Sequence, residues 1–450
     1  MLPEGGAPRE NDGMRLLHPR GLKALLVAAL PLIPALSATL LTPRTAQAKD
    51  GGDAKAKAEV AAQLAAFAKA CAEAGGKADA EKALLEAKAA DANAPGVKEA
   101  QEAADAVAEE KAGAAEAVAT ARKAAGQKIA KAYDQLAGTY GDPKESRRAT
   151  WALVASLAWE TSKPRIGKAQ KAMVAALGDN RLDEAARLHA GLCAADPQTA
   201  AAGKFDGPLI EAAQREMVLI GSPTNDLLAY LSLPKGWQKG KTYPVVVGVE
   251  GAGCGFLGYG NGLRSTRGSR AAIIVSPITL SNTNALDPAK YPQYPKSVLD
   301  AWDGKRLDFD GPGVDAILAI LSKRFGAEEK VFVSGFSGGG NWCYWKLFMD
   351  PAHVRGAAPA CANFSGNGIS SPPGAGEGGG PPVQLMTGAQ DPHKDDVFGA
   401  KPGIEGQTDA AQEKLKELGY TKVTRVQLQA GHSPLQAEVW KFVDTVLGAK

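Results

Sequence analysis

Ser337 lies in a sequence context typical of a nucleophilic serine. The apolar residues 331–333 before it predict a buried strand, and the aromatic-rich residues 341–349 after it predict a helix. The glycines at 335 and 339 complete a Gly-x-Ser-x-Gly pattern, in which a sharp strand-to-helix turn exposes the serine hydroxyl. We therefore predict that Ser337 is a nucleophile. The alternative is a hydroxyl that only satisfies a backbone group in a glycine-rich turn.

His432 is the candidate base that a serine nucleophile needs at neutral pH. It lies in the loop 429–434, between an alternating strand over 423–428 and an amphipathic helix over 435–447. In a parallel sheet this loop falls at the strands' carboxyl edge, where it can meet Ser337. A loop histidine without a role is the alternative. The other four histidines are less suitable. His18 lies in the leader, His189 in a separate helical region, His353 after the predicted helix that begins at Ser337, and His393 beside the acid candidate.

Asp391 is the candidate acid, because it follows the apolar strand predicted over 383–387 and precedes the histidine. Its carboxylate would orient the imidazole and stabilise the imidazolium that forms when Ser337 loses its proton. Asp395 and Asp396 are rivals, but they lie in a polar segment where a solvated charge is ordinary. The predicted catalytic residues are therefore Ser337, Asp391 and His432.

The chain order serine, aspartate, histidine resembles that of the α/β-hydrolase superfamily, and the resemblance covers residues 211–450. The segments LPKGW at 233–237 and YPVVV at 243–247 are similar to the opening of secreted esterases of the polyhydroxybutyrate depolymerase and feruloyl esterase type. Prolyl-oligopeptidase-like hydrolases share them. The resemblance implies an α/β fold, namely a mostly parallel eight-stranded sheet with flanking helices. The expected strands are 215–220, 227–233, 243–249, 271–276, 331–334, 354–359, 383–387 and 423–428, of which the first two form an antiparallel pair.

The loop EGAGCG at 250–255 follows the third expected strand. The resemblance implies that it supplies an oxyanion donor, so the predicted oxyanion hole combines the N–H of Gly338 with one from Ala252 or Gly253. Glu250 departs from the family, which usually has histidine there. An ionised carboxylate aimed into the hole would oppose the charge to be stabilised. The other arrangement is that Glu250 turns away and pairs with a cation or a backbone donor.

The substrate is expected to be a small-molecule or polymer-borne ester. The family often inserts a lid where this chain has the Gly-, Ser- and Pro-rich residues 362–381, and an open cleft suits such substrates. The aromatic candidates for a substrate surface are Trp342, Tyr344, Phe256, Tyr259, Tyr291 and Tyr294. Core packing is the alternative for at least half of them. The mechanism requires no cofactor, and no spacing of cysteine and histidine indicates zinc.

Residues 1–48 resemble a secretory signal peptide, with a basic segment, an apolar core over 24–41 and the cleavage-type triplet Ala46-Gln47-Ala48. Translation from Met14 fits this pattern better than translation from Met1, because the preceding residues include acids. We therefore expect an exported protein, periplasmic or extracellular. An uncleaved membrane anchor is the less favoured alternative.

The segments before the hydrolase-like part are rich in helix-forming residues. Residues 49–145, dominated by Ala, Lys and Glu, predict a helical hairpin or stalk of coiled-coil character, and residues 146–210 predict a small helical bundle. The first segment carries no chemical motif, so spacing, docking or cell-envelope association is the expected role. Residues 211–450 form the expected catalytic domain.

Charge and cysteine content limit the partners and the covalent structure. The net charge of +3, with lysine and arginine spread among acids, gives no reason to expect nucleic acid. The five cysteines cannot all pair within one chain, although an oxidising compartment permits one or two disulfides.

The residues together predict an exported serine hydrolase that cleaves carboxylic esters through an acyl-enzyme. One alternative is a prolyl-oligopeptidase-like serine peptidase. Such peptidases normally carry a β-propeller ahead of the hydrolase domain, and the helical region here lacks the repeated short strands of a propeller. The other alternative is a non-catalytic envelope or scaffold protein with a degenerate hydrolase fold. The observation that supports it is Glu250, whose carboxylate is unusual for an oxyanion loop.

Overall fold

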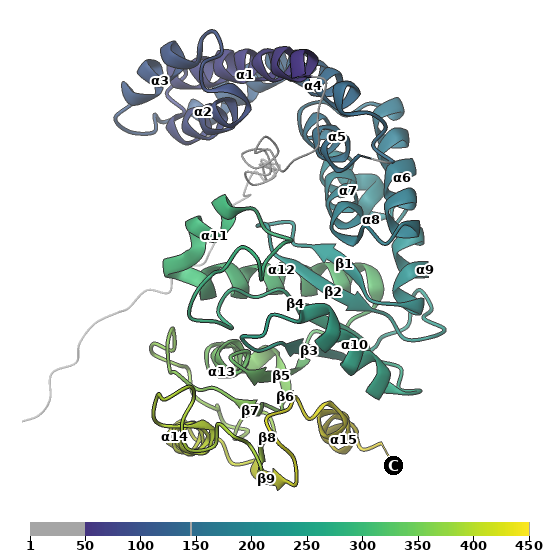
Figure 1. The fold of residues 1–450 in the computed structure, drawn as a ribbon, viewed down its shortest axis with the longest axis vertical. Helices are drawn as coiled ribbons and strands as arrows, with labels where there is room; N and C mark the ends of the chain where they lie inside the picture. Colours follow the sequence, from purple (N-terminus) through teal and green to yellow (C-terminus); the bar gives the residue numbers. More distant parts are fainter. Residues whose placement is uncertain (1–49, 145, 450) are drawn as a thin grey trace, which may run out of the picture. The chain divides into compact units, whose positions relative to one another are not determined.

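The computed structural model describes residues 50–144 and 146–449 (Figure 1). The predicted signal peptide, residues 1–48, lies outside the described residues. No helix within the described ranges combines the length and the apolar character needed to cross a bilayer.

The first half of the described chain is entirely helical. An alanine-rich core joins the first four helices, in which buried alanines allow the helix backbones to approach closely. A second core, with Leu153, Met173 and Leu188, lies among the next helices. The helices are α1 (Asp50–Glu73), α2 (Lys77–Asp91), α3 (Val97–Asp105), α4 (Ala114–Tyr140), α5 (Arg147–Trp159), α6 (Lys163–Gly178), α7 (Leu182–Ala195), α8 (Pro197–Ala201) and α9 (Gly207–Arg215).

The second half is built on a mixed sheet whose strand order is β1-β2-β4-β3-β5-β6-β8-β9, with β7 pairing with both β5 and β8. β1 and β2 form the expected antiparallel pair, β2 is antiparallel to β4, and the remaining pairs are parallel. The strands are β1 (Val218–Gly221), β2 (Leu228–Ser232), β3 (Val245–Val249), β4 (Ile273–Pro277), β5 (Val331–Ser337), β6 (Val354–Ala357), β7 (Ala360–Ala362), β8 (Val383–Gly388) and β9 (Val423–Leu428).

The sheet has nine strands rather than the expected eight. The strand expected over 354–359 ends at Ala357, and β7 begins at Ala360. Pro359, which lies between them, has no N–H to continue the hydrogen-bond ladder. Its carbonyl still accepts a hydrogen bond from Met386 N at 3.0 Å, so the chain stays beside β8 across the break.

Helices cover both faces of the sheet (Figure 1). α10 (Phe256–Arg267) and α15 (Gln436–Leu447) pack together on one face, where Trp440 Nε1 donates to the Leu263 carbonyl at 3.0 Å. The other face is covered by α12 (Arg306–Phe325), α13 (Gly340–Met349) and α14 (Ile404–Glu417). α11 (Lys296–Trp302) and the 3-10 turns η1 (Asp303–Lys305) and η2 (Pro351–His353) complete the described elements.

This cover explains the uninterrupted apolar sequence of the central strands. Val245, Val246 and Val247 of β3 are each 0% exposed, although successive side chains point to opposite faces. The strand order, the antiparallel start and the strand–turn–helix at Ser337 are those of an α/β-hydrolase fold, preceded here by an all-α region. The sequence prediction of this fold class is confirmed.

Two glycines that end helices provide a matched test of backbone packing. Gly326 and Gly448 follow α12 and α15 in the left-handed conformation, with φ of +73° and +67°. A Cβ at Gly326 would lie 1.9 Å from the Lys241 carbonyl oxygen, whereas nothing lies within 4 Å of one at Gly448. Replacement by alanine should lower the free energy of unfolding by at least about 3 kcal/mol at 326 and by about 1 kcal/mol at 448. Urea unfolding followed by tryptophan fluorescence measures both values. Equal losses would contradict the importance of the close approach to Lys241.

Candidate active site

Ser337 lies at the end of β5 in a strained backbone conformation. Its φ is +48°, in the left-handed region that non-glycine residues rarely adopt. The turn depends on neighbouring glycines, because a Cβ at Gly335 would lie 2.4 Å from the Gly339 carbonyl oxygen. Asn363 N donates to the Ser337 carbonyl at 2.8 Å and holds the turn against the chain after β7. The local sequence therefore folds into the tight turn that the glycine pattern predicts.

Asp391 and His432 are hydrogen-bonded to each other. His432 Nδ1 lies 2.7 Å from Asp391 Oδ2, and the aspartate side chain is fully buried while the histidine side chain is 18% exposed. The other oxygen, Oδ1, accepts the backbone N–H of His393 at 2.8 Å. A carboxylate held in this way keeps the proton on Nδ1 and leaves Nε2 as an acceptor.

The rival acids lie elsewhere in the same segment. Asp395 is exposed, and the Asp396 carboxylate accepts the backbone N–H of Gly399 at 2.7 Å. Of the three candidates, the structure brings Asp391 to the imidazole.

The nucleophile strand and the histidine loop meet through two neighbours of Ser337. The ring of Phe336 packs on the ring of His432, with centroids 4.8 Å apart. Ser337 is paired with Ala362 of β7, and the adjacent Cys361 places its Sγ within 4.8 Å of the polar atoms of Asp391 and His432. Among the described residues, no hydrogen bond joins the Ser337 hydroxyl to His432. In ligand-free enzymes this contact often tightens only when substrate binds.

The oxyanion candidates Gly338 and Ala252 lie side by side. A Cβ at Gly338 would lie 3.4 Å from Ala252 N and 1.9 Å from the Asn282 carbonyl oxygen. A Cβ at Gly251 would lie 2.8 Å from the Ser337 Cβ, so this loop lies directly against Ser337. Gly253 is placed differently, since the nearest neighbour of a Cβ there would be Glu250 Oε1 at 4.0 Å.

The Glu250 carboxylate turns back onto its own loop. Its Oε1 accepts the backbone N–H of Gly251 at 3.0 Å, which is the backbone-donor arrangement considered from the sequence. Burial raises the pKa of Glu250, and the hydrogen bond from Gly251 only partly offsets that rise. The carboxyl group therefore lies beside the oxyanion loop without a cationic partner in the described structure.

A network of buried polar groups holds the loop 250–255, which contains the candidate oxyanion donors, in place. Asn282 Nδ2 donates to the Gly251 carbonyl at 2.7 Å, and its Oδ1 accepts the Tyr291 hydroxyl at 2.7 Å. The buried Asp310 carboxylate accepts the N–H groups of Leu280 and Ser281, each at 2.8 Å. Burial raises the pKa of Asp310 to about 7, against the lowering effect of these hydrogen bonds. Sequence reasoning missed these positioning residues, because no local motif marks an asparagine that acts on a distant carbonyl.

The aromatic residues considered for a substrate surface lie in the core instead. Their exposed fractions range from 0% to 4%, for Trp342, Tyr344, Phe256, Tyr259, Tyr291 and Tyr294. The rings on α13 and α10 pack in the core beside the sheet that these helices cover, while Tyr291 packs on Phe256 and Tyr294 on Phe309. The exposed aromatic near the site is Phe398, at 86%. Its ring packs on His393, whose ring packs on His432.

The cysteines form no disulfide. All five are free, and Cys71, Cys343 and Cys361 are buried. The one or two disulfides that an oxidising compartment would permit are therefore not formed in this structure. Burial raises the pKa of Cys361 to about 11, so this thiol beside Asp391 stays protonated at neutral pH.

Comparison with known proteins gives structural likeness only. No family model and no curated protein matches the sequence. A poly(3-hydroxybutyrate) depolymerase from Bordetella parapertussis is 16% identical with a TM-score of 0.36, over 52% of this chain and 91% of that one. A Bacillus cereus carboxylesterase is 16% identical with a TM-score of 0.36, over 54% and 99%. A thermostable esterase is 14% identical with a TM-score of 0.33, over 52% of this chain, which spans 63% of that esterase. The fold assignment depends on the strand order and on the turn at Ser337 rather than on these likenesses.

The position of Glu250 predicts that its negative charge destabilises a nearby oxyanion when the carboxyl group is ionised, so the effect should depend on pH. In Glu250→Gln the side-chain oxygen still accepts from Gly251, but the negative charge is removed. For the ester hydrolysis proposed below, we expect kcat at pH 8 to rise about fivefold. The gain should shrink as the pH falls through the raised pKa of Glu250, because the wild-type carboxyl then becomes neutral.

The matched control for this change is Glu413→Gln on the exposed face of α14, which should leave kcat unchanged. Steady-state kinetics from pH 5 to pH 9 compare the variants. A loss of activity in Glu250→Gln would mean that the carboxylate assists the reaction.

Proposed function

We propose that this chain is a serine hydrolase that cleaves carboxylic esters through an acyl-enzyme. The observation that carries the proposal is the hydrogen bond between a fully buried Asp391 carboxylate and His432 Nδ1, in a loop that packs on the nucleophile strand. A buried carboxylate fixed on one imidazole nitrogen leaves the other free to accept a proton.

In the proposed reaction, the Ser337 oxygen attacks the ester carbonyl carbon while His432 Nε2 takes the hydroxyl proton. The carbonyl oxygen becomes negative and is stabilised by the N–H groups of Gly338 and Ala252, with Gly253 as the alternative second donor. His432 then gives its proton to the leaving alcohol as the C–O bond breaks. Water, deprotonated by the same histidine, hydrolyses the acyl-enzyme and releases Ser337.

The helices that precede the α/β-hydrolase fold favour ester hydrolysis over peptide hydrolysis. Described residues before β1 form helices, whereas a prolyl-oligopeptidase-like peptidase normally carries a propeller there. Between β7 and β8 the described chain forms turns and bends without a helix, which leaves room for a small or polymer-borne ester. The alternative of a non-catalytic scaffold requires that Ser337 be unreactive.

Export to the periplasm or the outside remains part of the proposal and is supported by the signal-like pattern of residues 1–48. For the helices of residues 50–144 we propose association with the cell envelope or spacing from it. The proposed reaction uses neither a cofactor nor a metal.

The proposal predicts that neighbouring aspartates differ sharply in importance. Asp391→Asn should lower kcat about 10³- to 10⁴-fold, because an amide cannot stabilise the imidazolium and favours the wrong tautomer. Asp395→Asn, four residues away and exposed, should change kcat less than twofold. Kinetics on chromogenic acyl, acetyl-sugar, feruloyl and hydroxyalkanoate esters measure both effects. Equal activities of the two variants on every hydrolysed ester would contradict the assigned triad.

A further inference from the structure

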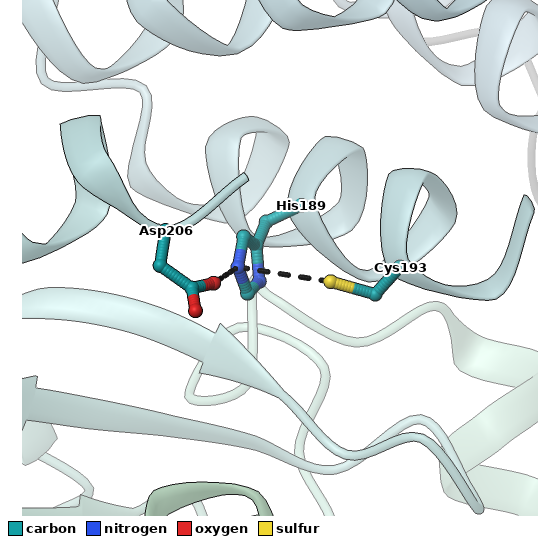
Figure 2. Close-up of side chains that lie close together, drawn as sticks. All are labelled: His189, Cys193 and Asp206. Carbon is teal, nitrogen blue, oxygen red and sulfur yellow. Dashed lines mark hydrogen bonds and ion pairs between the residues drawn. The ribbon is translucent and has the colours of Figure 1, made fainter. Parts of the chain in front are cut away.

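A second cluster of polar and reactive side chains lies where Arg324 of α12 contacts His189 and Cys193 of α7. His189 and Cys193 are one turn apart on α7, and Asp206 precedes α9 (Figure 2). Arg324, from the last turn of α12, completes the cluster. Sequence reasoning assigned His189 to a separate helical region and did not find the cluster, because its members come from α7, from α12 and from the residue before α9.

All three partners converge on one nitrogen of His189. Nε2 lies 2.9 Å from Asp206 Oδ1, 3.1 Å from Arg324 Nη2 and 3.8 Å from Cys193 Sγ. His189, Asp206 and Arg324 have side chains that are 3%, 2% and 7% exposed, respectively. Cys193 has intermediate exposure, whereas Cys71, Cys343 and Cys361 are buried.

This geometry does not relay protons as a catalytic triad does. The acid and the thiol contact the same imidazole nitrogen, whereas a triad needs the acid on one nitrogen and the nucleophile on the other. The polar atoms of His189, Cys193 and Asp206 lie within 4.8 Å of one another, close enough to surround a cation. The guanidinium of Arg324 already fills that role. It donates through Nε to Asp206 Oδ2 at 2.9 Å, and its second nitrogen also contacts the carboxylate.

Positive charge lies directly beside the sulfur. Arg324 Nη1 is 3.4 Å from Cys193 Sγ. Burial acts to raise the pKa of Cys193, but the charges and hydrogen bonds of His189 and Arg324 outweigh burial, so the net pKa is lowered. Asp206 has the opposite charge, and its two oxygens are occupied by Arg324. The buried thiols differ, since burial raises the pKa of Cys71 to about 12 and that of Cys361 to about 11.

We infer that Cys193 is held as a nucleophilic thiolate by Arg324 and His189 and is a site of covalent modification by hydroperoxides. The sulfur attacks one peroxide oxygen, an S–O bond forms and the O–O bond breaks. The sulfur loses two electrons to the peroxide and becomes sulfenic acid, and the leaving hydroxide or alkoxide takes a proton from water. This chemistry is separate from that of Ser337 and does not depend on the proposed esterase activity.

The test measures the reactivity of Cys193 in the intact chain. Iodoacetamide alkylation is followed by peptide mass spectrometry across pH 5 to pH 10, and dimedone labelling after hydrogen peroxide reports sulfenic acid. The midpoint of the pH–rate profile for Cys193 should lie at least about one pH unit below that of N-acetylcysteine, and dimedone should label the peptide that contains Cys193. A midpoint equal to or above that of N-acetylcysteine, or no dimedone adduct, would overturn the inference.

Two variants identify the source of the reactivity. Arg324→Gln removes the charge and should slow alkylation at pH 7 about tenfold. Arg324→Lys keeps the charge but not the fork that contacts both Asp206 and Cys193, so it should restore the rate only in part. Cys193→Ser should remove the dimedone adduct. If the arginine variants do not fold, the wild-type profile still decides the question. An unchanged rate in folded Arg324→Gln would show that Arg324 does not activate the thiol.

Discussion

The close approach of two backbone segments at Ser337 is the constraint on which the rest of the site depends. The turn after β5 holds a serine at φ +48°, and the loop after β3 passes so near that a Cβ at Gly251 would lie 2.8 Å from that of Ser337. Only a residue without a side chain fits at position 251. The same closeness brings Ala252 N beside Gly338, so the geometry that strains the nucleophile also forms the candidate oxyanion site.

Charge is distributed unevenly about this turn. Asp391 is fully buried and committed to His432 and to a backbone N–H, which favours positive charge on the imidazole. Glu250 brings a carboxyl group to the loop that contains the candidate oxyanion donors, where its Oε1 accepts the backbone N–H of Gly251. The oxyanion loop is held in place by Asn282 rather than by a charged group. Hydrogen bonds therefore fix the candidate site in place, and the Glu250 carboxyl group would oppose a negative charge on a bound oxyanion.

Local patterns in the sequence predicted most of the fold and the pairing at the site. Apolar runs and glycine turns located the eight expected strands. The position of His432 in the loop after β9 predicted that it pairs with Asp391, and the two side chains are hydrogen-bonded. The break between β6 and β7 was missed, although Pro359 is a local signal for it. Contacts that depend on tertiary packing had no such signal. Two such contacts are the hydrogen bond between Asn282 and Gly251 and the contact between Arg324 and Cys193, each of which joins segments that only the packed sheet and helices bring together. The burial of Trp342 likewise depends on this packing.

The most direct measurement of the central claim is reaction of the intact chain with a fluorophosphonate, which forms a bond only with an activated serine. The account predicts one adduct per chain, located at Ser337 by peptide mass spectrometry, lost on prior denaturation and lost in His432→Ala. A folded chain that takes no label at Ser337, or that is labelled equally well without His432, would contradict it.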